Sequence, residues 1–214
     1  MSLSTNSILF ATKNPGKLKE FKETLNKFNS SYTVLSLDDL GYEISDCEET
    51  GSTFFENAVI KAKNAQSQLK PMHKSLIVIA DDSGMVIDAL NGEPGVHTRR
   101  WNGSVMTDEE IIEYCLTKLR GTLDRRASYV TNFVILYPDG VIKSVLGRND
   151  GVILEKAREG SILKGMPFRA LFYIPSLGAM FHEVREMKEK DRRGYSLGYE
   201  EAIKEIVDSL GVTK

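Results

Sequence analysis

The sequence predicts a mixed α/β protein built on an elongated β-sheet with flanking helices. Three observations support this fold class. Apolar runs of strand length alternate with helical patterns in the first half, a hairpin signal follows in the second half, and the 214 residues include 41% hydrophobic residues. That length and content are enough for one full core. We therefore expect a single domain over residues 1–214, with two lobes and a cleft between them.

The first elements form a strand, a turn and a helix. Residues 7–12 have the apolar content of a short buried strand, and residues 13–16 contain the turn-forming pair Pro15-Gly16. Apolar residues at positions 18, 21, 25 and 28 then have the spacing of a helix over residues 17–28. Residues 32–37 are expected to form the next strand.

The middle of the chain continues the alternation with a helix and then a strand. Residues 53–69 predict a helix with Ser52 or Thr53 as its N-cap, and Glu56 stands three residues after Thr53 in a capping-box pattern. Residues 76–80 form an apolar, β-branched run that indicates a buried strand.

The second half adds helices at its two ends and strands between them. The turn Pro138-Asp139-Gly140 lies between two β-branched runs, which is the pattern of a hairpin. The predicted elements are a helix over residues 108–119 capped by Thr107 or Asp108, strands over 127–137 and 141–146, a further strand over 151–154, and a helix over 199–210.

Charge and composition exclude several partners. A net charge of −2 and a pI of about 6.0 give no basic surface for a nucleic acid polymer or an anionic membrane. No apolar run approaches the roughly 18 residues of a membrane span, and the N-terminus lacks the features of a signal peptide. Cys47 and Cys115 have no metal-ligand spacing, so free thiols in a reducing compartment are expected. A cytoplasmic protein is the resulting expectation.

The most informative residues follow the strand predicted over 76–80. The apolar run leads directly into Asp81 and Asp82, and then into Ser83 and Gly84, which we interpret as a turn. Carboxylates at the end of a buried strand are costly to dehydrate unless a cation or donor meets them. The pattern favours a divalent-metal site, and a loop with an acidic helix cap is the alternative.

Residues 12–17 indicate a phosphate site. The N-terminus of the following helix offers unpaired N–H groups and a positive dipole end. Thr12 and Asn14 add donors, and Lys13 and Lys17 add positive charge. The alternative is an ordinary helix start with surface lysines.

A second acidic pair precedes the predicted helix over 53–69. Glu48 and Glu49 supply carboxylates for a hard cation, and Lys61 can neutralise charge nearby. Mg²⁺ usually binds through one or two carboxylates together with substrate phosphates. The alternative is a solvated acidic turn and a surface lysine.

Four blocks, in this order, resemble the inosine/xanthosine triphosphate pyrophosphatase family. They are ILFATKNPGKLKEF, EETGSTFFENAVIKAKNA, IADDSGMVIDALNGEPGVHTRRW and DRRASYVTNFVILYPDG, and the resemblance spans residues 7 to about 140. It implies hydrolysis of ITP, dITP and XTP to the nucleoside monophosphate and pyrophosphate. It also implies Mg²⁺ as cofactor, a nucleotide cleft between two lobes and a homodimer.

The resemblance assigns roles to individual residues. Asp82 matches a Mg²⁺ ligand and proton acceptor, and Lys61 matches a phosphate contact. Glu48 matches a metal-linked position, with Glu49 as the neighbouring candidate, and Asp81 flanks the site, where it can hold a second ion or tune Asp82. The implied substrate-binding residues of these blocks are Thr12, Lys13, Asn14, Lys17 and Ser83.

The last third departs from the family pattern at the residues that read the base. Phe168 keeps the aromatic side chain, but Arg169 replaces an Asp, which reverses the charge. Arg193 fits a later Ser-His-Arg-Gly motif, whereas Asp191 and Arg192 replace its Ser and His. Lys188 fits only with one residue deleted from the spacer. We expect Phe168, Arg169, Lys188, Arg192 and Arg193 to contact the substrate.

Three functions follow from this pattern. The first is a Mg²⁺-dependent pyrophosphatase for non-canonical purine nucleoside triphosphates. The second is the same chemistry on a different nucleotide, because a site that hydrogen-bonds one base penalises others strongly. The third is a catalytically silent nucleotide-binding homologue.

Overall fold

The computed structural model describes residues 6–211, and the chain divides into two compact units. The first unit comprises the chain up to Asp82, residues 131–147 and the chain from Gly198 onwards. The second unit comprises residues 83–130 and 148–197. Three strands, β3 (Ile77–Ile87), β4 (Arg126–Leu136) and β5 (Ile142–Ile153), contribute residues to each unit. The single domain and the cleft between lobes stay predictions.

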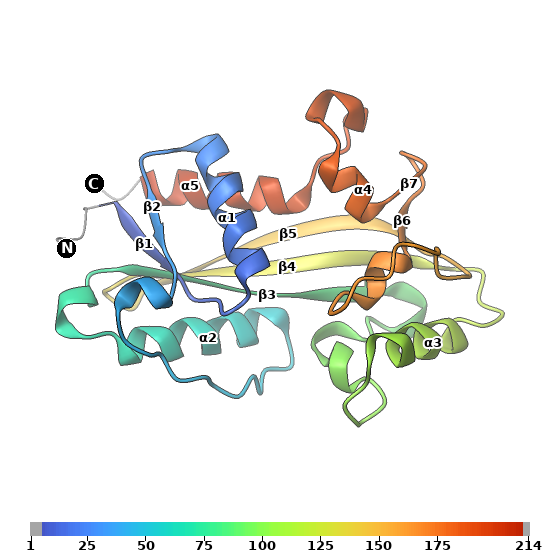
Figure 1. The fold of residues 1–214 in the computed structure, drawn as a ribbon, viewed down its shortest axis with the longest axis horizontal. Helices are drawn as coiled ribbons and strands as arrows, with labels where there is room; N and C mark the ends of the chain where they lie inside the picture. Colours follow the sequence, from blue (N-terminus) through green and yellow to red (C-terminus); the bar gives the residue numbers. More distant parts are fainter. Residues whose placement is uncertain (1–5, 212–214) are drawn as a thin grey trace. The chain divides into compact units, whose positions relative to one another are not determined.

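The strands form a seven-stranded sheet in the order β2-β1-β3-β4-β5-β6-β7 (Figure 1). β1 (Ser7–Phe10) pairs in parallel with β2 (Thr33–Leu35) and with β3. β6 (Phe172–Ile174) pairs antiparallel with β5 and with β7 (Ala179–Met180). This mixed sheet with flanking helices confirms the predicted fold class.

In the first unit, helices cover both faces of the strands. α1 (Pro15–Phe28) and α5 (Gly198–Gly211) lie on one side, and α2 (Phe54–Gln68) lies on the other (Figure 1). Side chains of successive strand residues point to opposite faces. Ile79 of β3 accordingly packs in the core with α1 and α5, whereas Val78 and Ala80 pack in the core with α2. Odd positions of this part of β3 therefore face α1, and even positions face α2.

The predicted helix starts agree well with the structure. Thr53 caps α2 in a full capping box with Glu56, and Thr107 does the same for α3 (Asp108–Lys118) with Glu110. α1 begins at Pro15, two residues before the predicted start, because Asn14 acts as its N-cap and proline is well suited to the first helical position.

One prediction about the central strand is wrong. The strand does not end at residue 80, and residues 81–84 are not a turn: β3 runs through them to Ile87. Carboxylates within a buried strand are tolerated here because each has a cationic partner, Lys17 for Asp81 and Lys61 for Asp82. The short strands β6 and β7 and the helix α4 (Phe181–Glu186) were not predicted.

The second unit has its own apolar core. Met85 and Ile87 of β3 pack there with residues of α3, β6 and α4. Cys115 is buried in this core, and burial raises the pKa of its thiol to about 12. Across residues 6–211, no helix combines the length and the apolar character that crossing a bilayer requires.

Candidate active site

Asp81 and Asp82 point to opposite faces of β3, as strand geometry requires. Asp81 is only 4% exposed, and its Oδ2 lies 2.6 Å from the Nζ of Lys17 on α1. A buried carboxylate without such a partner would carry a large desolvation cost. α1 packs on the face of β3 to which Asp81 points, and its Lys17 supplies the cation that the Asp81 carboxylate needs.

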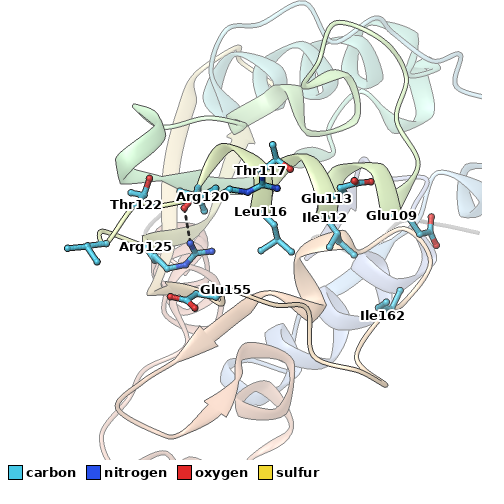
Figure 2. A pocket seen from close by; sticks show the side chains of 13 residues that line it. Glu109, Ile112, Glu113, Leu116, Thr117, Arg120, Thr122, Arg125, Glu155 and Ile162 are labelled. Atoms are coloured by element: carbon cyan, nitrogen blue, oxygen red, sulfur yellow. Dashed lines mark hydrogen bonds between the residues drawn. The ribbon is translucent and has the colours of Figure 1, made fainter.

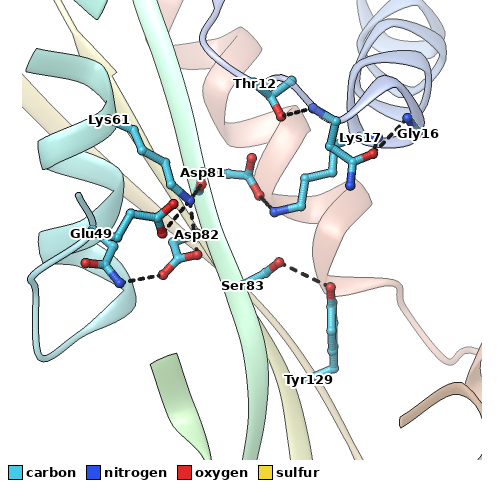
Figure 3. Close-up of polar contacts among 11 residues, drawn as sticks. Thr12, Gly16, Lys17, Glu49, Lys61, Asp81, Asp82, Ser83 and Tyr129 are labelled. Carbon is cyan, nitrogen blue, oxygen red and sulfur yellow. Dashed lines mark hydrogen bonds and ion pairs between the residues drawn. The ribbon is translucent and has the colours of Figure 1, made fainter. Parts of the chain in front are cut away.

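Asp82 faces α2, and two side chains of that helix hold its carboxylate (Figure 3). The Nζ of Lys61 lies 3.2 Å from Oδ1, and the Nδ2 of Asn57 donates to Oδ2 at 3.1 Å. Lys61 also donates to the backbone carbonyl of Asp81 at 3.1 Å. Its ammonium lies 3.0 Å from Oε2 of Glu49, so one lysine links two carboxylates.

The segment before α2 positions Glu49. The Gly51 N–H donates to the side-chain oxygen of Asn57 at 2.8 Å, and the Ser52 hydroxyl donates to Glu56 at 2.6 Å. The hydrogen bonds from Ser52 lower the pKa of Glu56. Glu56 is therefore a capping residue of α2, and Glu49 is the carboxylate of this segment that contacts Lys61.

The start of α1 gathers the predicted phosphate-binding residues. The side-chain oxygen of Asn14 accepts from the N–H groups of Gly16 at 2.9 Å and Lys17 at 3.2 Å. Lys13 forms an exposed ion pair with Asp46 at 2.8 Å, and its hydrogen bond with Asp46 raises the pKa of Lys13. Because Asn14 already accepts from the first N–H groups of α1, an anion here would be bound mainly by the ammonium groups of Lys13 and Lys17.

These side chains line a cavity of about 270 Å³ in the first unit. It lies among the start of α1, the segment before α2 and the middle of β3. Its lining includes the predicted residues Thr12, Lys13, Asn14, Lys17, Glu49, Lys61 and Asp81, together with Cys47. Glu48 is exposed. Asp82 is not among the lining residues, but its carboxylate contacts Lys61, which is.

The carboxylates suit a metal that also binds substrate oxygens. Among the described residues 6–211, no group of three or more His, Cys, Asp or Glu side chains is arranged to hold a metal ion. Glu49 and Asp82 nevertheless provide two hard oxygen ligands, with the Lys61 ammonium between them. This donor set fits Mg²⁺, which takes few protein carboxylates and completes its shell with phosphate oxygens and water.

The remaining predicted residues belong to the second unit. Ser83 accepts a hydrogen bond from the hydroxyl of Tyr129 at 3.2 Å. Phe168 is partly buried, with its ring 6.3 Å from that of Trp101. Arg169 is partly buried, and burial together with this arginine lowers the pKa of the neighbouring His182.

The last basic segment differs in exposure from residue to residue. Lys188 and Arg193 are exposed, and Arg193 has a left-handed backbone conformation with φ +50°. Arg192 is only 5% exposed, and its guanidinium donates to the carbonyl oxygen of Met187 at 3.0 and 3.2 Å. Arg192 therefore ties its own turn together.

A larger hollow of about 730 Å³ lies beside α3 in the second unit (Figure 2). None of the predicted site residues lines it. Arg125 donates to the carbonyl oxygens of Leu119, Ile153 and Leu154, so its guanidinium is used to hold the backbone. The cavity of the first unit therefore remains the candidate active site.

Two partners of predicted site residues, Asn57 and Tyr129, were not found by the sequence analysis. Asn57 stands four residues before Lys61, which places both on one face of α2, and its position among the apolar residues of a helix was the available signal. Tyr129 lies in a strand, where an aromatic residue is ordinary, so the sequence pattern did not predict its hydrogen bond to Ser83.

Comparison with known proteins places this geometry in a family. The model of the Ham1 family matches residues 8–198. The chain belongs to the Ham1 family. The match confirms the resemblance found in the four sequence blocks and extends it through the divergent last third.

Ham1 relatives are similar over most of their length. A dITP/XTP pyrophosphatase of Thermus thermophilus is 38% identical over 188 residues, which cover 86% of this chain and 84% of that protein. A dITP/XTP pyrophosphatase of Bacillus anthracis is also 38% identical, over 78% of this chain and 79% of that protein. The Ham1 protein of Staphylococcus aureus has a similar structure, with a TM-score of 0.74, 33% identity and coverage of 97% of this chain and 100% of that one.

Proposed function

We propose that this Ham1 protein is a Mg²⁺-dependent pyrophosphatase that converts dITP, ITP and XTP to the nucleoside monophosphate and pyrophosphate. The single observation that carries the proposal is the cavity lined by Lys17, Lys61, Asp81 and Glu49, where Lys61 also pairs with Asp82. The names of its relatives, dITP/XTP pyrophosphatases, support the choice of substrate.

The two lysines bind and neutralise the triphosphate. A triphosphate is strongly anionic, so attack on phosphorus requires compensating charge that is already in position. Lys17 enters from α1 and Lys61 from α2, with their Nζ atoms held by Asp81 and by Asp82 with Glu49. In these positions the ammonium groups stabilise the charge that develops on the departing pyrophosphate.

Asp82 orients the attacking water and accepts its proton. Its two carboxylate oxygens are held by Lys61 and Asn57, which fixes the direction in which the group can accept. The water oxygen bonds to the α-phosphorus, the bond to the bridging oxygen breaks, and pyrophosphate leaves.

Glu49 and Asp82 would hold Mg²⁺ together with phosphate oxygens. When bound, the ion supplies charge neutralisation and lowers the pKa of a coordinated water. Lys61 contacts both carboxylates, so the lysine and the cation would share the neutralisation of this pair.

A nucleotide panel tests the proposal. The kcat/KM for pyrophosphate release is measured with Mg²⁺ over ITP, dITP, XTP, GTP, ATP, UTP and dTTP. The proposal expects pyrophosphate with ITP, dITP or XTP as the preferred substrate, and loss of the activity when EDTA removes the cation. Absence of pyrophosphate release from every nucleotide would leave the silent homologue as the better description.

Arg169 favours a second candidate, the same chemistry on another nucleotide. Its guanidinium is a donor where the family pattern has an acceptor carboxylate, so base recognition is expected to change. In the panel, a strong preference outside ITP, dITP and XTP would support this candidate. An Arg169→Asp variant that regains preference for those three would support it further.

We also propose that the protein acts as a homodimer in the cytoplasm, as the family resemblance implies. Its net charge of −2 supports a small anionic substrate over a nucleic acid polymer. The molar mass in solution, measured by light scattering, tests the dimer: twice 23.9 kDa is expected, and 23.9 kDa would contradict it.

A further inference from the structure

We infer that Asn57 is a positioning residue that fixes the Asp82 carboxylate relative to the acidic segment at residues 48–51. The inference rests on the proposed function, since it assigns Asn57 to the step that Asp82 carries out. Asn57 lies in the first turns of α2 and is only 3% exposed, so its polar side chain is nearly removed from solvent. A polar group buried to this extent needs partners for its donors and its acceptor.

The orientation of the Asn57 side chain is determined independently of Asp82. The backbone N–H of Gly51 donates to Oδ1 of Asn57 at 2.8 Å, and only the oxygen of a carboxamide can accept that bond. The NH₂ group must therefore point the other way. There Nδ2 donates to Oδ2 of Asp82 at 3.1 Å.

The contact between Gly51 and Asn57 requires a glycine at position 51. A Cβ atom at position 51 would lie 2.7 Å from Oδ1 of Asn57 and 2.9 Å from its backbone nitrogen, distances that side chains do not tolerate. Glycine lets the backbone approach close enough for the N–H to reach the carboxamide. The segment that carries Glu49 is thereby tied to α2.

The same helix holds Asp82 from two directions. Asn57 and Lys61 are four residues apart on α2, and they bind Oδ2 at 3.1 Å and Oδ1 at 3.2 Å. Lys61 contributes charge, whereas Asn57 contributes only direction. Asn57 is 3% exposed and does not line the cavity, whereas the side chain of Asp82 is 13% exposed, so Asn57 acts on the reaction through Asp82.

Isosteric replacement tests this role. Asn57→Asp keeps an acceptor for Gly51 and replaces the donor toward Asp82 with an anion. Gln66→Glu is the matched control, because Gln66 lies on the same helix, outside the cavity, and donates to the carbonyl of Tyr137 at 2.9 Å. The measurements are kcat and KM for pyrophosphate release from the best substrate of the panel, and Tm.

The expected result separates turnover from binding and from stability. Asn57→Asp lowers kcat about 10- to 100-fold, the usual effect of losing a partner that orients a catalytic ligand, while KM changes less than about 3-fold. Gln66→Glu lowers Tm at least as much as Asn57→Asp does, but its kcat stays at the wild-type value. If Asn57→Asp does not fold, Asn57→Ala is measured in the same way.

Three results would overturn the role of Asn57: an unchanged kcat in the folded variant, a rise in KM alone, or an equal loss of kcat in Gln66→Glu. These are distinct from failure of the proposed function, in which the wild-type protein itself releases no pyrophosphate.

Discussion

At the scale of single residues, the candidate site is a set of ion pairs between lysines and carboxylates. Lys17 holds Asp81, and Lys61 holds Asp82 and Glu49. Both lysines line the cavity, and each neutralises at least one carboxylate. Under the proposed function, these ammonium groups would bind phosphate while Mg²⁺ neutralises the carboxylates.

We predict that Lys17→Met lowers kcat/KM for pyrophosphate release about 100-fold, because a cation placed for the developing charge is removed. It also leaves the buried Asp81 without its ion pair, so Tm falls. Lys27→Met is the control: Lys27 lies on the same helix and pairs with Glu200 at 2.9 Å. The prediction fails if both variants keep kcat/KM within about 3-fold of the wild type.

The two cysteines differ in how they should react. Cys115 is buried, with a thiol pKa raised to about 12, whereas Cys47 lines the cavity and its thiol pKa is raised mainly by burial. The thiolate is the nucleophile, so a raised pKa means less thiolate at a given pH and slow alkylation that accelerates as pH rises.

We predict that iodoacetamide labels Cys47 and spares Cys115 in the folded protein at pH 8, and that a triphosphate with Mg²⁺ slows the labelling of Cys47. Peptide mass spectrometry reads both sites. Equal labelling of the two cysteines would contradict the burial of Cys115, and labelling of Cys47 that ignores the nucleotide would contradict its place in the cavity.

At the scale of elements, local sequence signals were sufficient to predict the helix starts. The full length of β3 depends on ion pairs between residues that are distant in the sequence. Thr53 and Glu56 cap α2 because both partners lie within one turn, so the sequence pattern is sufficient. β3 could not be predicted to its full length, since the cations that make Asp81 and Asp82 tolerable there lie 64 and 21 residues away. The sequence pattern predicted cationic roles for Lys17 and Lys61, but not which carboxylate each lysine pairs with.

The cap of α2 gives an element-scale prediction. Thr53→Ala should lower the free energy of unfolding by about 1 kcal/mol, because the N–H of Glu56 loses its side-chain acceptor. Ser67→Ala, at an exposed position near the other end of α2, should change it by less than about 0.5 kcal/mol. Urea unfolding of the two variants checks this, and equal values for both would contradict the capping assignment.

At the scale of the whole molecule, the family match covers residues 8–198, which includes parts of both compact units. The first unit contains the phosphate and metal candidates, and the second contains the divergent residues Arg169, Asp191 and Arg192. The first group matches the family blocks residue by residue, so its proposed chemistry could be predicted from the sequence. Arg169, Asp191 and Arg192 depart from the family pattern, so the preferred base could not be predicted.

We predict that an α,β-methylene triphosphate analogue raises Tm only when Mg²⁺ is present. A ligand at 100 times its Kd stabilises the folded state by about 2.7 kcal/mol, which thermal unfolding detects easily. EDTA should abolish the shift, because the carboxylates of Glu49 and Asp82 repel phosphate without a bridging cation. The same shift with and without Mg²⁺ would contradict a metal at this site.

The most direct test of the central claim compares pyrophosphate release from dITP by the wild-type protein and by Asp82→Asn. The asparagine keeps the size of the side chain and removes its ability to accept the proton of water. We predict Mg²⁺-dependent release of one pyrophosphate per nucleoside monophosphate in the wild type, and a kcat at least about 100-fold lower in the folded variant. Release of pyrophosphate by Asp82→Asn at the wild-type rate would contradict the assignment of this cavity as the active site.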